Sequence, residues 1–492
     1  MTTKLAAQNL DAISASTATP SYDRSALSAG IVHFGVGNFH RAHQAVYLDS
    51  LFNTGHDHGW AITGAGVLPS DEKMRRVLAG QDFLTTVVEQ SATRSTARVT
   101  GAMIDFLSPN DPAAIIRTLA DPAIRIVSLT ITEGGYFIDL ASGAFDTGNP
   151  EIAADGAAPE SPKTVFGLIV AGLKRRREAG IQPFTVMSCD NIPHNGVVAR
   201  NAVAGLARLS DPEFSHWILD QVAFPNGMVD RITPATGDRE REIITRDFDI
   251  EDNWPVFCED FTQWVLEDKF PAGRPALERV GVQFVPDVTP YEHMKIRILN
   301  GGHAVIAYPA GLLDIHFAHE AMEHSVIRSF LQKIEREEII PVVPPVPDTD
   351  LQKYFNKIEE RFANPKIGDT IRRLCLDGSN RQPKFIIPSI ADRLKSSAGV
   401  TGLALASALW CRYCYGTTEN GKTIETNDPN WDRLRSVART AKDDAAAWLK
   451  MEDIYGDVGS SDVFRKHFAI MLEAIWSEGV ERVITRYVEG EI

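Results

Sequence analysis

The strongest constraint on the fold is an apolar run that ends in two glycines, Ile31-Val-His-Phe-Gly-Val-Gly37. Residues 39–53 follow with apolar positions at helical spacing, and a second apolar run covers residues 61–67. A strand, a glycine turn, a helix and a second strand form a βαβ unit, in which the helix joins two parallel strands. The chain is therefore expected to contain an α/β fold with a parallel sheet.

More strands are predicted further along the first half. Residues 83–89 are β-branched and aromatic, and residues 124–131 and 184–187 are continuous apolar runs, with a predicted helix at residues 162–179 between the last two. Continuous apolar runs are typical of parallel strands that are covered on both faces. The alternation of strand and helix predicts a doubly wound, Rossmann-type sheet.

The second half of the chain is predicted to be mostly α-helical. The proline-rich residues 340–347 predict a stiff connector within it, and the predicted helices cover residues 290–313, 319–338, 348–362, 401–415, 431–451 and 460–477. We therefore expect a Rossmann-type cofactor-binding domain at residues 1–285 and a helical substrate domain at residues 286–492. Residues 1–28, rich in Ser, Thr and Ala, are expected to form a loosely held leader.

Composition excludes several classes of protein. The 44% hydrophobic and 23% charged residues suit a globular chain, and a net charge of −15 without a basic stripe argues against nucleic-acid binding. The first 20 residues show no apolar core of the length that a signal peptide has, and no apolar stretch reaches about 18 residues. The 5 cysteines, an odd number, suit a reducing compartment. We expect a cytoplasmic protein without membrane or nucleic-acid partners.

The glycine turn is a candidate phosphate-binding loop. Gly35 and Gly37 leave a buried strand and open a helix, where a pyrophosphate can approach the backbone and the helix N-terminus. The third glycine of the usual G-x-G-x-x-G pattern is absent, because position 40 is His. From the motif alone, a dinucleotide site and a plain βα turn are equally good interpretations.

Asp71 is the candidate for the acidic residue that holds the adenosine ribose. It follows Gly37 by 34 residues, where a spacing of about 20 is usual. The alternative is that Asp71 or Ser70 caps the next helix. Nearby basic residues, Lys73, Arg75 and Arg76, leave NADP open beside NAD.

The most informative segment is residues 289–303, which begin with a capping box of Thr289 and Glu292. At about 100° per residue of an α-helix, Lys295, Asn300 and His303 lie within an arc of about 140°. A polar cluster of this kind is either a site or simply a solvated helix face with lysine and histidine exposed.

Two features favour the site. Gly301 and Gly302 cost about 1 kcal/mol each in a helix, which predicts that another group packs closely against the backbone there. Burial can lower the pKa of a lysine amine toward neutrality, so that Lys295 could act as a general base. An amide such as Asn300 could donate to a developing alkoxide.

With these residues in place, the chain resembles the polyol-specific long-chain dehydrogenases, the mannitol dehydrogenase family, with mannitol 2-dehydrogenase as the nearest branch. The resemblance runs from about residue 28 to the C-terminus. The motifs that carry it are His33-Phe-Gly-Val-Gly-Asn-Phe-His-Arg-Ala-His43, Thr130-Ile-Thr-Glu-Gly-Gly-Tyr136, Ser188-Cys-Asp-Asn-Ile-Pro-His-Asn-Gly196, Met228-Val-Asp-Arg-Ile-Thr-Pro234 and the segment with Lys295, Asn300 and His303.

The resemblance implies a role for each matching residue. Lys295 would be the general base, and Asn191 and Asn300 would bracket the oxygen that alternates between alcohol and carbonyl. His303 would orient the substrate, and Glu133 would influence proton passage near the lysine. Substrate hydroxyls would also meet Arg373 and Lys384. Cofactor binding would fall to Gly35, Gly37, Asn38, Phe39, Arg41, Asp71 and Asp230.

Structural alternatives stay open for several of these residues. Asn191 could close a turn before Pro193, Asp230 could form an ion pair with Arg231, and Arg373 could lie on a solvated helix face. Family members often carry a Glu-Asp pair for the adenosine ribose, whereas this chain has Ser70-Asp71. This departure weakens the expected preference for NAD without reversing it.

The implied function is the NAD-dependent, metal-independent and reversible oxidation of D-mannitol to D-fructose, by a monomer or weak homo-oligomer. Arabinitol, sorbitol and fructuronate remain alternative substrates within the family. A zinc enzyme is a rival interpretation, because Cys411 and Cys414 have metal-like spacing, although no further ligand pair completes a site. A non-catalytic dinucleotide sensor is the alternative from another class.

Overall fold

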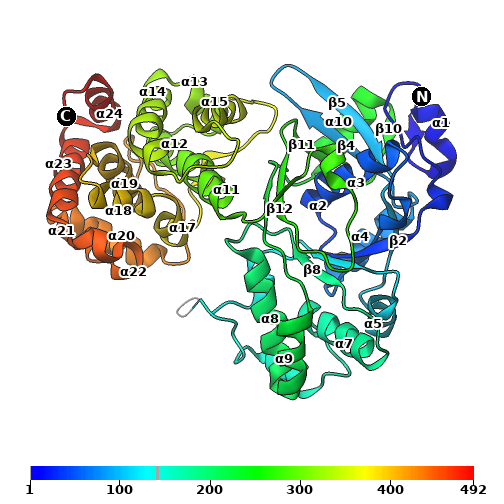
Figure 1. Ribbon diagram of the computed structural model, residues 1–492. Coiled ribbons are helices and arrows are strands. Elements are labelled where there is room, and N and C mark those ends of the chain that lie inside the picture. The colour runs from blue at the N-terminus through cyan, green and yellow to red at the C-terminus, as the bar shows by residue number, and fades with distance from the viewer. Residues whose placement is uncertain (1, 140–142) are drawn as a thin grey trace. The chain divides into compact units, whose positions relative to one another are not determined.

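The computed structural model describes residues 2–139 and 143–492, and the chain divides into two compact units, Met1–Thr289 and Pro290–Ile492 (Figure 1). The sequence predicts a boundary between residues 285 and 286, which is four residues before the end of the first unit.

The first unit is built on a five-stranded parallel sheet with the order β6-β3-β2-β7-β8. Its strands are β2 (Ala29–Phe34), β3 (Ala61–Ala65), β6 (Met103–Phe106), β7 (Ile126–Leu129) and β8 (Thr185–Ser188). The strand order reverses at β2, with β3 and β7 on opposite sides of it. This arrangement confirms the predicted doubly wound sheet, whose ligand-binding edge lies beyond the carboxyl ends of the strands at the reversal.

Helices cover both faces of this sheet, and the strands are buried accordingly. Val32 and Phe34 belong to one apolar core, whereas Ile31 belongs to the other. The first core includes α5 (Pro112–Ala120), α7 (Val165–Glu178) and α8 (Asn195–Ser210), and α7, α8 and α9 (Pro212–Gln221) lie together in Figure 1. The second core includes α3 (Gln44–Asn53) and α4 (Pro69–Ala79).

Two smaller sheets complete the first unit. One has the order β11-β4-β5 and comprises β4 (Thr85–Gln90), β5 (Ser95–Thr100) and β11 (Val256–Glu259). The other has the order β13-β12-β9 and comprises β9 (Gly227–Asp230), β12 (Gln263–Glu267) and β13 (Gln283–Val285). The predicted strand at residues 83–89 is therefore β4, which pairs antiparallel with β5 outside the central sheet.

The expectation of a loosely held leader is wrong. Thr3–Lys4 form β1, which pairs with β10 (Ile250–Glu251), and the Leu5 amide donates to the Glu251 carbonyl at 3.0 Å. Leu5 and Ile13 are 0% and 2% exposed and pack in a core with β4 and β5 residues. The segment is held by a few isolated apolar side chains, which have no periodicity for a sequence pattern to detect.

The second unit is mostly helical, as predicted. Its central helix α19 (Thr401–Cys414) is buried along nearly its whole length. The unit also contains α12 (Gly301–Leu312), α13 (Ala318–Glu323), α14 (Ser325–Ile334), α15 (Leu351–Phe362), α16 (Ile371–Leu374), α17 (Gly378–Phe385), α18 (Ile387–Lys395), α20 (Trp431–Ala441), α21 (Ala446–Leu449), α22 (Glu452–Tyr455), α23 (Asp462–Glu478) and α24 (Val480–Glu489). Of these, α12, α20, α23 and α24 pack against α19. The predicted helix at residues 431–451 is two helices, α20 and α21.

The buried helix α19 also decides how Cys411 and Cys414 are placed. Both thiols are buried, and burial raises the pKa of each well above its ordinary value. Over residues 2–139 and 143–492, no group of three or more His, Cys, Asp and Glu side chains could hold a metal ion. None of the helices in this part of the chain is long and apolar enough to cross a membrane.

Candidate active site

The glycine turn lies at the carboxyl edge of the central sheet, where β2 meets β7. Gly35 has φ 89°, and a Cβ on it would lie 2.0 Å from the Thr130 carbonyl oxygen. The Thr130 hydroxyl donates to the Gly35 carbonyl at 2.6 Å, and the His33 ring approaches the same carbonyl at 3.2 Å. The fold itself therefore requires glycine at position 35.

Gly37 is different, because nothing in the protein needs its lack of a side chain. A Cβ on Gly37 would meet only the Gly35 carbonyl oxygen, at 3.8 Å, and its φ of −94° suits any residue. The missing side chain leaves open space over the turn, directly before α2 (Asn38–Ala42). That space fits the predicted close approach of a pyrophosphate to the backbone.

The residues after the turn hold it in place. Asn38 donates to the Pro234 carbonyl at 3.0 Å, and Phe39 stacks on His43 with 4.9 Å between ring centroids. His43 also marks a break between α2 and α3 (φ −121°, ψ −88°), so the predicted helix at residues 39–53 is two helices.

Arg41 has a place that the sequence analysis did not foresee. It is 0% exposed, and its guanidinium donates to the Gly37 carbonyl at 3.3 Å, the Asn38 side-chain oxygen at 2.9 Å and the Trp254 carbonyl at 2.6 Å. Burial lowers the pKa of Arg41 to about 10. Through these contacts within the protein, Arg41 supports the glycine turn, and its expected role in cofactor binding stays a prediction.

His33 and His40, which flank the turn, form a buried stack with ring centroids 3.5 Å apart. Burial lowers the pKa of His33 to about 3 and the pKa of His40 well below its ordinary value, so both rings are neutral. His33 reaches the hydroxyls of Ser128 at 2.8 Å and Thr130 at 2.9 Å. The motif contained this histidine, but no local pattern indicated that it braces the ends of two neighbouring strands.

Asp71 combines the two interpretations that the sequence left open. Its Oδ2 accepts from the amides of Val67 at 2.9 Å and Leu68 at 2.8 Å, which satisfies the start of α4. The same carboxylate folds back over Gly66, where a Cβ would lie 2.3 Å from Oδ2. The carboxylate therefore lies just beyond the end of β3, where a ribose-binding acid is expected, despite the long spacing from Gly37.

Glu133, Asn191 and Asp230 each follow the end of a strand. Glu133 is exposed on the short turn Glu133–Tyr136 after β7, Asn191 is exposed after β8, and Asp230 is the last residue of β9 and 5% exposed. Between β8 and Asn191 stands Asp190, a buried residue that the sequence analysis did not single out. Burial raises the pKa of Asp190 and Glu133 adds to this, while hydrogen bonds from Tyr136 and two amides lower it.

Arg231, which the sequence suggests as an ion-pair partner of Asp230, forms an ion pair with Glu89. The Arg231 guanidinium donates to Glu89 at 2.7 Å, to the Glu259 carbonyl at 3.0 Å and to the Ala42 carbonyl at 2.6 Å. Arg231 thus ties the end of β9 to β4, β11 and α2.

In the second unit, Lys295–Asn300 form a π-helical turn between α11 (Thr289–Met294) and α12, and the Gly301 amide bonds to the Ile296 carbonyl five residues earlier. The prediction of an uninterrupted α-helix is therefore wrong here. A π turn holds about 4.4 residues, or about 82° each, which places Asn300 about 50° from Lys295 instead of about 140°. His303 then lies about 10° from Lys295 on the other side.

Burial excludes a solvated helix face for Lys295, whose role in a site stays a prediction. Lys295 is 7% exposed and Glu292 is 5% exposed, so neither lies on a solvated helix face. Asn300 and His303 are partly buried, and the His303 ring stacks on Phe362 with centroids 4.0 Å apart. The π turn thus brings a buried amine, an amide and an imidazole onto one helix face.

The predicted close packing is confirmed at Gly302, whereas Gly301 has ordinary van der Waals neighbours. A Cβ on Gly301 would lie 3.4 Å from the Phe385 carbonyl, and a Cβ on Gly302 would lie 3.3 Å from both Glu335 Oε1 and Phe362. Phe385 ends α17, the helix that also carries Lys384.

Glu335 is a neighbour of α12 that the sequence did not predict. It is 0% exposed, and neither carboxyl oxygen has a hydrogen-bond partner within residues 2–139 and 143–492. Burial alone raises the pKa of Glu335 well above its ordinary value of 4.5, because a buried carboxylate loses the water that stabilises its charge. It begins a second π-helical turn, Glu335–Ile339, which contacts the first.

The two predicted basic substrate contacts are both exposed. Arg373 pairs with Asp369 at 2.6 Å, and Lys384 lies near the end of α17. Arg373 lies on α16, and the Cys375 thiol that follows this helix donates to the Ala307 carbonyl of α12 at 3.5 Å. Both basic residues therefore belong to helices that pack against the segment with Lys295 and His303.

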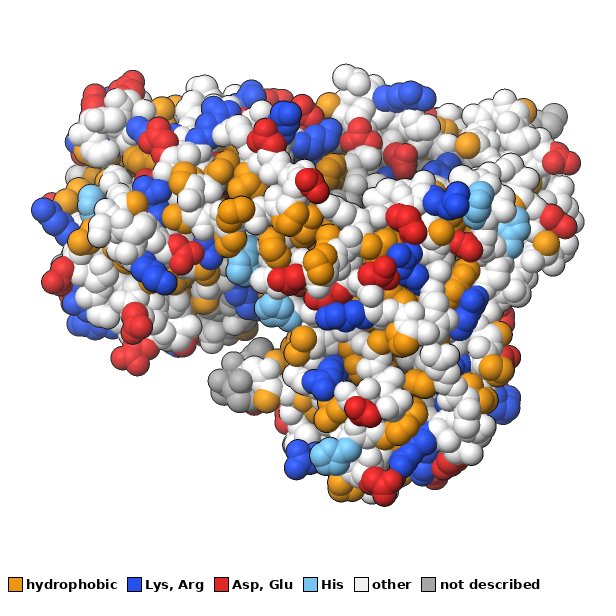
Figure 2. All heavy atoms as spheres, in the orientation of Figure 1, with side chains coloured by type: hydrophobic (Ala, Val, Ile, Leu, Met, Phe, Trp, Pro, Cys, Tyr) orange, Lys and Arg blue, Asp and Glu red, His pale blue; other side chains and the backbone are white. Residues whose placement is uncertain are grey.

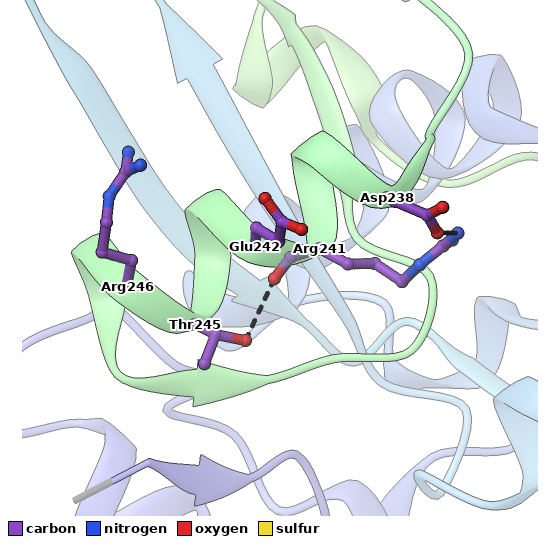
Figure 3. Close-up of a pocket in the computed structure, with 5 residues that line it drawn as sticks. All are labelled: Asp238, Arg241, Glu242, Thr245 and Arg246. Carbon is purple, nitrogen blue, oxygen red and sulfur yellow. Dashed lines mark hydrogen bonds and ion pairs between the residues drawn. The ribbon is translucent and has the colours of Figure 1, made fainter.

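None of the predicted site residues lines the surface hollow along α10 (Asp238–Phe248), which is shown in Figure 3. Its lining is a single charged helix face that includes the ion pair of Asp238 with Arg241 at 2.5 Å. Figure 2 shows Lys and Arg interspersed with Asp and Glu on the visible face, which fits the absence of a basic stripe in the sequence.

Comparisons with known proteins show the family. Residues 29–279 match the mannitol dehydrogenase Rossmann domain, and residues 287–476 match the mannitol dehydrogenase C-terminal domain. The chain belongs to the mannitol dehydrogenase family. It is therefore an oxidoreductase that acts on a CH–OH group.

Individual relatives match over nearly their whole length. The chain is 60% identical over 474 residues to mannitol 2-dehydrogenase of Cereibacter sphaeroides, covering 96% of this chain and 99% of that one. It is 40% identical to mannitol 2-dehydrogenase of Neosartorya fischeri over 498 residues, covering 99% of each.

Two solved structures share the fold. The mannitol 2-dehydrogenase of Pseudomonas fluorescens, in a ternary complex with NAD and D-mannitol, has a TM-score of 0.88 and 42% identity over 99% of this chain and 100% of that one. A D-sorbitol dehydrogenase in substrate-free form has a TM-score of 0.91 and 37% identity over 98% of this chain and 100% of that one.

The different surroundings of Gly35 and Gly37 generate a paired prediction. Gly37→Ala should change the melting temperature by about 2 °C or less, because its Cβ meets open space, and should weaken NADH binding about tenfold or more, because the methyl fills the phosphate approach. Gly35→Ala should instead destabilise the fold by about 3 kcal/mol or more. Thermal melting and NADH fluorescence titration measure both effects. Parent-like NADH binding by Gly37→Ala would remove the turn from the cofactor site.

The raised pKa of Glu335 predicts a pH dependence of stability. The pKa of Glu335 is higher in the folded chain than in the unfolded chain, so unfolding releases a proton above about pH 4.5. The free energy of unfolding of the parent should therefore fall with rising pH, relative to Glu335→Gln, by up to about 1.4 kcal/mol per pH unit. Urea unfolding of both proteins at pH 5.5 and 7.5 measures this difference.

The matched control is Glu338→Gln in the same π-helical turn. Glu338 is also buried, and burial raises its pKa, but hydrogen bonds from the Gly402 amide at 2.6 Å, the Leu403 amide at 3.0 Å and the Tyr487 hydroxyl at 3.0 Å counteract this shift. Glu338→Gln should destabilise the chain at both pH values, because it weakens these bonds. A stability gap between the parent and Glu335→Gln that does not change with pH would show that Glu335 is ionised in the folded chain.

Proposed function

We propose that the protein is a reversible NAD-dependent polyol dehydrogenase that oxidises D-mannitol to D-fructose without a metal ion, with Lys295 as general base. The observation that carries this proposal is the π-helical turn, which gathers the buried Lys295, Asn300 and His303 on one face. The 60% identity to a mannitol 2-dehydrogenase over 474 residues supports the choice of substrate.

The first unit suits NAD. The open space over Gly37 admits a pyrophosphate, and the Asp71 carboxylate beyond β3 accepts hydrogen bonds from the ribose hydroxyls. The glycine turn is followed by Asn38 and Phe39, and β9 ends with Asp230. Arg41 supports the turn through its buried hydrogen bonds. The related ternary complex with NAD and D-mannitol supports this assignment, and the single acid at Ser70-Asp71 leaves some use of NADP open.

The chemistry removes a proton and a hydride from one CH–OH group. Lys295 accepts the hydroxyl proton, and Asn191 and Asn300 donate their amide N–H groups to the oxygen as its negative charge develops. NAD, when bound, accepts the hydride from the same carbon. His303, fixed by its stack on Phe362, binds a neighbouring hydroxyl, and Glu133 assists the departure of the proton taken up by Lys295.

Sorbitol is the second candidate substrate. A D-sorbitol dehydrogenase shares 37% identity with the chain, with a TM-score of 0.91, and mannitol and sorbitol differ only in the configuration of one carbon. Arabinitol and fructuronate are further alternatives, and a fructuronate reductase would use Arg373 or Lys384 for the substrate carboxylate. In the mannitol enzyme, these two residues meet sugar hydroxyls.

Substitution of Lys295 tests the mechanism. Lys295→Ala should lower kcat for mannitol oxidation by about 100-fold or more, because a general base contributes that much, while the Kd for NADH stays within about threefold of the parent. Stopped-flow turnover and fluorescence titration measure the two quantities. The expected result also excludes the alternative of a non-catalytic dinucleotide sensor, which has no turnover to lose.

The matched control is Lys333→Ala. Lys333 is a partly buried lysine of α14 that donates to the Tyr487 carbonyl at 2.8 Å, away from the π turn of Lys295. It should lose stability but keep the parent kcat. Equal turnover of Lys295→Ala and the parent would remove Lys295 from the reaction.

A substrate panel tests the proposed specificity. Oxidation rates on mannitol, sorbitol and arabinitol, and reduction rates on fructose and fructuronate, should place mannitol and fructose first by about tenfold in kcat/KM, which corresponds to a difference of about 1.4 kcal/mol in transition-state binding. The same rates after dialysis against a chelator should be unchanged. A higher kcat/KM on sorbitol or fructuronate would replace mannitol as the substrate while leaving the family chemistry in place.

A further inference from the structure

We propose that Asp190 is a positioning residue that holds Glu133 and Asn191 in place for the reaction. This inference rests on the proposed function, in which those two side chains serve catalysis. Asp190 follows β8 and immediately precedes Asn191, and its carboxylate reaches the segment after β7 that carries Glu133. Asp190 is thus adjacent to Asn191 in the sequence and hydrogen-bonded to the segment that carries Glu133.

The carboxylate binds the backbone on both sides of Glu133. Its Oδ2 accepts from the Ile131 amide at 2.9 Å and its Oδ1 accepts from the Thr132 amide at 2.9 Å. The Tyr136 hydroxyl, three residues beyond Glu133, donates to Oδ2 at 2.7 Å. Because Asp190 is only 8% exposed, these charge-assisted bonds are largely shielded from water and are stronger than exposed ones.

The same contacts form part of a closed ring of hydrogen bonds. The Asp190 amide donates to the Ser188 hydroxyl oxygen at 3.3 Å, and the Ser188 and Tyr136 hydroxyls lie 2.6 Å apart. Tyr136 uses its one hydroxyl hydrogen on Asp190, so Ser188 donates to Tyr136. Both hydroxyl hydrogens in the ring are therefore used in hydrogen bonds. These bonds join the end of β8 to the turn after β7.

The backbone between these bonds is strained. Thr132 has φ 64° and ψ 165°, a conformation that is nearly exclusive to glycine and costs a β-branched residue on the order of 1–3 kcal/mol. The Thr132 amide is one of the two that Asp190 holds. Such a conformation persists only where its surroundings enforce it, and here it turns the chain so that Glu133 is exposed instead of buried.

The other end of this segment does not depend on Asp190. Thr130 is bonded to Gly35 by its own hydroxyl and to Phe34 by its amide at 2.9 Å. The cofactor turn is thus braced by Thr130 and His33, whereas Glu133 and Asn191 are braced by Asp190. Loss of Asp190 should therefore affect substrate turnover and leave dinucleotide binding in place.

The chain offers a matched control for this contact. Asp155, 4% exposed, accepts from two consecutive amides, Lys163 at 2.8 Å and Thr164 at 2.9 Å, and from the Thr164 hydroxyl at 2.7 Å. It has the same donor set as Asp190 but belongs to α6 (Pro150–Ala157), which holds no predicted site residue. Asp155→Asn and Asp190→Asn should therefore lose similar stability.

The experiment compares Asp190→Asn, Asp155→Asn and Tyr136→Phe with the parent in melting temperature, NADH titration and mannitol kinetics. Asp190→Asn should lower kcat/KM for mannitol by about 10- to 100-fold, as expected when reacting groups are misplaced by about 1 Å, with the Kd for NADH within about threefold of the parent. Asp155→Asn should keep the parent kcat/KM within about threefold. The kcat/KM of Tyr136→Phe should lie between the values of these two variants.

Each failure has its own signature. Parent kinetics in Asp190→Asn, or equal kinetic losses in Asp190→Asn and Asp155→Asn, would overturn the positioning role. If Asp190→Asn does not fold, Tyr136→Phe decides the matter, because it removes one bond of the set, and parent kcat/KM in that variant would overturn the role. A parent protein that turns over no polyol would instead contradict the proposed function itself.

Discussion

The close approach of Gly35 to the Thr130 carbonyl is the contact on which the candidate site of the first unit depends. The chain can leave β2 with φ 89° only because position 35 has no Cβ, which would lie 2.0 Å from that carbonyl. Thr130 returns a hydroxyl to Gly35, and the segment that begins at Thr130 is held in turn by Asp190 after β8. Three neighbouring strand ends are thereby joined where the strand order reverses, the edge at which doubly wound sheets bind ligands.

In the second unit, the arrangement of the candidate site depends on an irregular turn within a helix. The π-helical turn shifts Asn300 and His303 toward the side of Lys295, and the backbone of Gly301 and Gly302 lets α17, Phe362 and Glu335 pack closely behind it. Such a turn loses regular α-helical hydrogen bonds, so its persistence requires support from neighbouring elements. The observed packing provides this support, and it also buries the amine of Lys295, the proposed general base.

The sequence predicted the elements that repeat along the chain and missed those that depend on one distant contact. Apolar runs and glycines located β2, its turn and the lysine segment, since their patterns are local. The π turn was missed because a periodicity of 100° per residue was assumed throughout. Asp190 was missed because a carboxylate that accepts amides from a neighbouring strand end leaves no spacing pattern, and Leu5 was missed because a single buried side chain shows no periodicity.

Buried carboxylates in this chain divide into two kinds, and the division bears on the reaction. Asp190, Asp155 and Glu338 each accept backbone amides, which offset the loss of water. Glu335 has no such partner within residues 2–139 and 143–492, and burial alone raises its pKa well above its ordinary value. An ionised carboxylate behind Gly302 would place negative charge beneath the helix of Lys295 and favour its ammonium form. Burial favours the protonated acid at Glu335, which in the proposed reaction would add no such charge beside Lys295.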